Sequence, residues 1–146
     1  MIAAPASPEV SSTPPDAPPH SAAAVGTDPS RPDAPNVCVI LDDVRSLYNV
    51  GAVMRACDGA GIFTVHACGI TPFPPAGPDL RDDPRRGPVA ARAARELRKV
   101  ALAAYDTVRV THWPDAYAAI AHVRRYGAAV VAVETSPDAV RYRGCL

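Results

Sequence analysis

Three residues that suit an anionic partner stand close together in the first half of the chain. They are Asn49, Gly51 and Arg55, in the pattern N-x-G-A-x-x-R. An amide and a guanidinium beside a helix start are typical of phosphate binding, because the helix start itself favours anions. The same residues also have an ordinary interpretation, since asparagine is a common helix cap and an exposed helical arginine is usual.

A buried strand and an amphipathic helix are expected to position these residues. Residues 37–41 form a continuous apolar run, which is typical of a strand buried on both faces. Asn49 is expected to cap the next helix, and Arg55 then points outward, about 9 Å further along the helix axis. Both side chains would lie beyond the carboxyl end of the strand, where open α/β sheets bind ligands. The helix is expected to bury a stripe made of Val50, Val53, Met54 and Cys57.

The chain that follows alternates between strands and helices. Such alternation implies right-handed βαβ crossovers and a parallel sheet, so the expected fold class is α/β. Strands are expected at 63–67, 108–110 and 128–133, helices at 89–105 and from Pro114, and a long loop at 69–88. The helix at 89–105 is expected to break near Val100.

Two groups of basic residues come after the N-x-G-A-x-x-R pattern in the chain. Arg81, Arg85 and Arg86 are expected to pair with the neighbouring Asp79, Asp82 and Asp83 rather than to meet RNA phosphate. Arg92, Arg95 and Lys99 share one helical face, opposed only by Glu96. We predict that face as a weak RNA-binding surface, with a solvated helix face as an equally good interpretation.

Composition limits the class of protein. Residues 1–36 carry nine of the seventeen prolines and a net charge of −3, so we expect a disordered Pro/Ala-rich tail. The remainder is only mildly basic, and composition alone does not indicate RNA. The four cysteines form no C-x-x-C pair, so neither a metal nor a metal site is expected. The sequence shows no signal peptide and no run that spans a bilayer, and we expect a cytoplasmic protein without a membrane partner.

The segment LYNVGAVMRACDGAG resembles the first conserved motif of the SpoU (TrmH-like) family of RNA 2′-O-ribose methyltransferases, of the SPOUT superfamily. The segments GITPFPP, DDPRRGPVAARAARELRKVALAAYDTVRVTHWPDAYAAI and AAVVAVETSPDAV extend the resemblance over residues 37–140. It implies a Rossmann-like sheet, a homodimer, S-adenosylmethionine as methyl donor, and tRNA or rRNA as substrate. It also implies that Asn49 and Arg55 are catalytic, with Arg55 binding the RNA.

The family's second and third motifs, which build the donor site in a carboxyl-terminal trefoil knot, have no counterpart here. We therefore expect a partial methyltransferase domain at 37–140, without the knot region, and an unmatched tail at 141–146. Glu134 and Thr135 are weak candidates for contact with the donor. The alternatives are a catalytically inactive RNA-binding or dimer-forming remnant, and an unrelated nucleotide-binding module. The latter is disfavoured because neither G-x-G-x-x-G nor a P-loop follows the first strand.

Overall fold

The computed structural model describes residues 36–75, 83 and 85–141, and in them it contains one parallel sheet of three strands. The strand order is β1–β2–β3, with β1 at Val39–Asp42, β2 at Thr64–Cys68 and β3 at Arg109–Trp113. Val39 lies opposite Val65, and Val65 lies opposite Val110. The predicted α/β class and parallel sheet are therefore confirmed.

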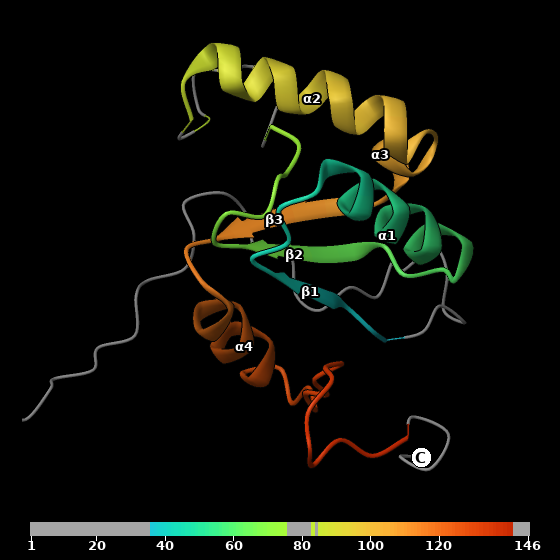
Figure 1. Cartoon of the computed structure of the whole chain (residues 1–146), viewed down its shortest axis with the longest axis vertical. Coiled ribbons are helices and arrows are strands. Elements are labelled where there is room, and N and C mark those ends of the chain that lie inside the picture. Colours follow the sequence, from blue (N-terminus) through green and yellow to red (C-terminus); the bar gives the residue numbers. More distant parts are fainter. Residues whose placement is uncertain (1–35, 76–82, 84, 142–146) are drawn as a thin grey trace, which may run out of the picture.

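Helices cover the two faces of this sheet unequally (Figure 1). Helices α1 (Leu47–Gly59), α2 (Gly87–Ala101) and α3 (Ala104–Thr107) lie on one face, and α4 (Ala116–Arg124) lies on the other. The larger core is between the sheet and the first three helices, and a smaller one joins Cys68 and Trp113 to Ala119 of α4. The larger core contains Leu41, Val50, Met54, Cys57, Val65, Leu97, Ala101, Ala104 and Val108.

The N-cap residue of helix α1 lies three residues before the one that was predicted. The hydroxyl of Ser46 accepts a hydrogen bond from the backbone N–H of Asn49 at 3.3 Å, so Ser46 is the N-cap. The prediction that Asn49 caps the helix is wrong, because Ser46 already satisfies a free N–H of the first turn. The predicted stripe is confirmed in Val50, Met54 and Cys57, which are buried, while Val53 is half-buried.

Helices α1 and α2 approach each other closely at Gly51. A Cβ atom at this position would lie 2.6 Å from Cγ1 and 2.8 Å from Cβ of Val100, which no structure tolerates without a shift. Helix α2 ends one residue later, at Ala101, and Leu102 takes a left-handed φ of 54°. The predicted break near Val100 is thus confirmed.

The chain after α4 differs from the expectation. The predicted strand at 128–133 is wrong: these residues form no strand and are mostly exposed, with Val131 at 79% and Val133 at 98%. An apolar run forms a buried strand only where a partner strand and a covering face are present, and here neither contacts it. Of the predicted tails, 1–35 and 142–146 lie outside the described residues.

Candidate functional site

The loops at the carboxyl ends of β1 and β2 are joined through Asp43. This residue has a left-handed φ of 48°, which is uncommon for a residue with a side chain. Its Oδ1 atom accepts a hydrogen bond from the backbone N–H of Ile70 at 3.0 Å. Gly69 also has a positive φ, of 59°, and a side chain there would collide with the Asp43 carboxylate. The glycine is therefore required both by its conformation and by the close carboxylate.

Thr71 and His112 extend this network to all three strands. The Thr71 hydroxyl donates to the carbonyl of Leu41 at 3.1 Å and accepts from the N–H of Val44 at 3.0 Å. Nε2 of His112 donates to the carbonyl of Gly69 at 2.9 Å. These bonds hold the carboxyl edge of the sheet in one arrangement, so the groups that this edge presents are preorganised.

Arg85 lies in the long loop that precedes α2, and it borders the hydrogen-bonded network at the carboxyl edge of the sheet. Its guanidinium makes two hydrogen bonds to Asp83, at 2.8 and 2.6 Å, and a third to the carbonyl of Phe73 at 2.9 Å. The Phe73 ring lies 3.7 Å from Cζ of Arg85 and stacks on His112 at 4.1 Å between centroids. Hydrogen bonding from Arg85 lowers the pKa of the buried Asp83 carboxyl.

The predicted pairing of this loop is confirmed for Arg85 and Asp83. Arg81, Asp79 and Asp82 lie outside the described residues, and Arg86 is exposed at the start of α2. Because the donors of Arg85 are engaged by Asp83 and Phe73, it has a structural role here. A bidentate, half-buried pair of this kind fixes the loop and leaves little for a ligand.

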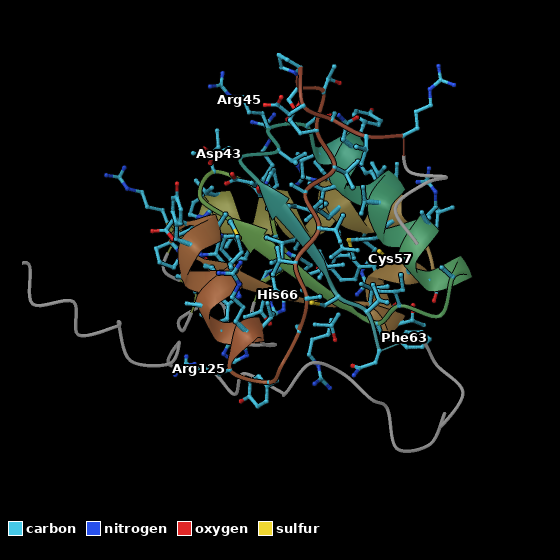
Figure 2. The ribbon with its side chains drawn as sticks, turned by 90° about the horizontal axis from the view of Figure 1, so that it is seen from below. Asp43, Arg45, Cys57, Phe63, His66 and Arg125 are labelled. Carbon is cyan, nitrogen blue, oxygen red and sulfur yellow. The ribbon has the colours of Figure 1, made fainter. Side chains whose placement is uncertain are left out.

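The two residues predicted to be catalytic lie on the same helix but have different surroundings. Asn49 is exposed in the first turn of α1, next to the Asp43–Arg45 loop that Figure 2 shows at one end of the sheet. Arg55 is also exposed, as expected, but its Nη1 atom donates to the carbonyl of Val100 in α2. That carbonyl belongs to the last turn of α2, where carbonyl groups lack helical partners and a cation is favoured. One donor of Arg55 therefore stabilises the contact between α1 and α2.

The basic face of α2 is present but partly neutralised. Arg92, Arg95 and Lys99 are all exposed. Glu96 lies between two of them, 3.1 Å from Arg95 and 3.3 Å from Lys99. Arg92 is thus the member of the group whose charge is least compensated among the described residues. The candidates for contact with the donor, Glu134 and Thr135, are exposed in the coil after α4 and end no strand.

A buried cluster on the α4 face was missed by the sequence reasoning. Nε1 of Trp113 donates to Nδ1 of His66 at 2.9 Å, and the Trp113 ring lies 4.9 Å from that of His122. The Nε2 atoms of both histidines are buried and have no hydrogen-bond partner among the described residues. Burial lowers the pKa of His66 to about 4, so both rings are neutral near pH 7. Trp113 itself is 4% exposed, so its ring serves packing.

No group of three or more histidine, cysteine, aspartate or glutamate side chains within the described ranges is arranged to hold a metal ion. Nor does that part of the chain contain a helix with the length and apolar character needed to cross a membrane. Comparison of the chain with models of protein families, with curated proteins and with solved structures finds no match.

Proposed function

We propose that this chain belongs to an RNA 2′-O-ribose methyltransferase of the SpoU type, and that its described residues form the RNA-facing side of the site. One observation carries the proposal. The asparagine of N-x-G-A-x-x-R is exposed at the start of α1, directly beyond the carboxyl end of a strand in a parallel sheet. That is the position at which open α/β sheets take ligands.

Asn49 and the start of α1 would bind the RNA backbone beside the reacting ribose. The helix start offers a partial positive charge, and the amide of Asn49 offers both a donor and an acceptor. Asp43 and Thr71 support this edge, because Oδ1 of Asp43 and the hydroxyl of Thr71 are hydrogen-bonded to the backbone. The contribution of these residues is orientation of the 2′-hydroxyl.

Arg55 can serve the RNA while it holds α2. A guanidinium has five N–H donors, and the contact with the Val100 carbonyl uses Nη1. The remaining donors leave a fixed cation on the surface of α1, suited to an adjoining phosphate or to the charge that develops on the ribose oxygen. Guanidinium stays protonated in proteins, so Arg55 acts as a cation and not as a general base.

The methyl donor of this family, S-adenosylmethionine, would supply an activated methyl group. The described residues do not form a site for it, because Glu134 and Thr135, the candidates for contact with it, are exposed in the coil after α4. The second candidate function, a catalytically inactive RNA-binding remnant, is favoured by the structural contacts that Gly51 and Arg55 make with Val100.

The test is methyl transfer to unmodified tRNA and rRNA transcripts by the full chain with methyl-labelled S-adenosylmethionine. A 2′-O-methyl group blocks alkaline cleavage of the adjacent linkage, so labelled alkali-resistant dinucleotides identify the product. Asn49→Ala should abolish the label. Arg124→Ala removes an exposed arginine from the opposite face of the sheet and should not. RNA binding without methyl transfer would support the inactive remnant instead. If the chain showed neither RNA binding nor methyl transfer, both proposals would be refuted.

A further inference from the structure

Helix α1 presents an exposed aromatic ring beside the proposed RNA-facing site. Tyr48 lies in the first turn of α1, directly before Asn49, and is 75% exposed. Within the described ranges, its ring and hydroxyl make no ring contact or hydrogen bond. A single exposed aromatic residue is ordinary on a protein surface. The role of Tyr48 therefore has to be argued from the groups that surround it.

Helical spacing places Tyr48 and Arg55 on one face of α1. Seven residues make about two full turns and advance about 10 Å along the helix axis. Ala52 lies between the two on the same face and is exposed, so only a methyl group separates the ring from the guanidinium. Asn49 lies about 100° further round the helix. One elongated ligand can therefore contact the ring, the amide and the guanidinium together.

Cations flank the Tyr48 ring on both sides along the chain. Arg45 is exposed in the loop directly before α1 (Figure 2), and it forms no ion pair with a described residue. Arg55 follows the ring and uses Nη1 for the carbonyl of Val100. The first turn of α1 contains no acidic residue, and Asp58, further along, accepts a hydrogen bond from Thr107 at 2.6 Å. Cations around an aromatic ring match a single nucleic-acid strand, in which phosphates alternate with flat bases.

A surface ring of this kind can stack only on a base that is not held in a duplex. Inside paired RNA, both faces of a base are covered by its neighbours, and the major groove is too deep and narrow for side chains. Unpaired bases in loops and at ends can turn outward and stack on aromatic side chains. The other exposed tyrosines of the described ranges, Tyr117 and Tyr126, lie in or directly after α4 on the opposite face of the sheet. Tyr48 is therefore the exposed tyrosine that adjoins the proposed site.

We propose that the Tyr48 ring stacks on an unpaired RNA base next to the reacting ribose, with Arg45 and Arg55 on the phosphates to either side. Because Tyr48 directly precedes Asn49, a base stacked on the ring brings its ribose to the start of α1. The target nucleotide then belongs to a loop or another single-stranded segment, and not to a paired stem. This inference rests on the proposed function and adds to it the class of RNA that the site accepts.

The test is the RNA affinity of the full chain, measured by fluorescence anisotropy at one salt concentration because phosphate contacts depend on salt. The probes are a labelled unmodified tRNA transcript, which contains loops, and a fully paired RNA duplex. Tyr48→Ala should weaken binding of the transcript by about 5-fold to 150-fold, the range for loss of one stacked base. Binding of the duplex should not change. Tyr48→Phe keeps the ring and should bind both probes as the wild type does.

Tyr117→Ala is the matched control, because Tyr117 is 84% exposed in α4 on the opposite face of the sheet, and it should leave both affinities unchanged. Equal losses for the transcript and the duplex with Tyr48→Ala would assign Tyr48 to the RNA backbone and overturn the inference. A loss with Tyr48→Phe as large as with Tyr48→Ala would overturn it too, because the hydroxyl would then be the contact.

Failure of this inference can be distinguished from failure of the proposed function. If Tyr48→Ala bound the transcript as tightly as the wild type while Asn49→Ala still abolished methyl transfer, the stacking role would be refuted and the proposed function would stand. If Tyr48→Ala changed only the oligomeric state, measured by light scattering, the ring would belong to an interface between copies and the inference would be overturned. If the wild-type chain bound neither RNA, both would be refuted.

Discussion

Substitution of Gly51 by alanine tests whether the glycine of the N-x-G-A-x-x-R pattern serves packing or chemistry. The added Cβ would lie 2.6 Å from Cγ1 and 2.8 Å from Cβ of Val100, and 3.1 Å from the backbone N of Ala101. Two of these neighbours belong to or adjoin the backbone of α2, so a side-chain rotation cannot relieve the collision. Helices α1 and α2 must therefore move apart.

Two opposing effects set the magnitude. Overpacking of a well-packed contact destabilises a protein by about 1–3 kcal/mol. Alanine is favoured over glycine inside a helix by about 1 kcal/mol, which offsets part of this. Gly59 provides the reference, because it lies in the same helix and a Cβ there meets nothing within 4 Å. We expect Gly51→Ala to be about 1–3 kcal/mol less stable than Gly59→Ala.

Urea denaturation followed by circular dichroism measures both free energies of unfolding. A second variant, Val100→Ala combined with Gly51→Ala, removes the nearest atom, Cγ1, and should recover part of the loss. The resulting coupling energy reports direct contact between positions 51 and 100. If Gly51→Ala were as stable as Gly59→Ala, the close approach of α1 and α2 would be refuted, and a ligand role for Gly51 would gain.

Three further outcomes are expected. Arg55→Ala should lose about 0.5–1.5 kcal/mol of stability with its hydrogen bond to the α2 carbonyl, while Arg92→Ala should change stability by under about 0.5 kcal/mol; equal values in urea denaturation would contradict the contact. His66 binds its proton less tightly when folded, so stability should fall by about 3 kcal/mol as pH drops from 6.5 toward 4; an NMR-measured pKa near 6.5 for His66 would contradict this. Asp83→Ala leaves a half-buried guanidinium unpaired and should destabilise by about 3–5 kcal/mol in the same urea assay, and a neutral result would show that the ion pair does not form.

Local patterns were sufficient to predict most of the fold. The apolar run before Asp42, the stripe in α1 and the alternation of strands and helices predicted the parallel sheet correctly. These features depend on periodicity within one element, which sequence displays directly. The break near Val100 was also predicted, and α2 ends at Ala101.

Features that depend on partners distant in sequence were not predictable. Ser46 and Asn49 are both good caps, and which one is used depends on where the loop from Asp43 delivers the chain. The contact between Arg55 and Val100 joins residues 45 positions apart. The strand predicted at 128–133 was wrong. An apolar pattern shows that a segment can be buried, but it does not show whether a neighbouring strand pairs with that segment.

The structural contacts of Gly51 and Arg55 change what the sequence pattern means as evidence. Both residues fix α1 against α2 through Val100, so their presence is explained without any substrate. Asn49 has no such explanation: Ser46 caps the helix, and the Asn49 side chain is exposed at the edge where open α/β sheets generally bind ligands. Of the three residues, Asn49 therefore carries the strongest functional inference. The α1–α2 contact in turn fixes the direction in which Asn49 and Arg55 face, so the packing of one helix would position both groups of the proposed site.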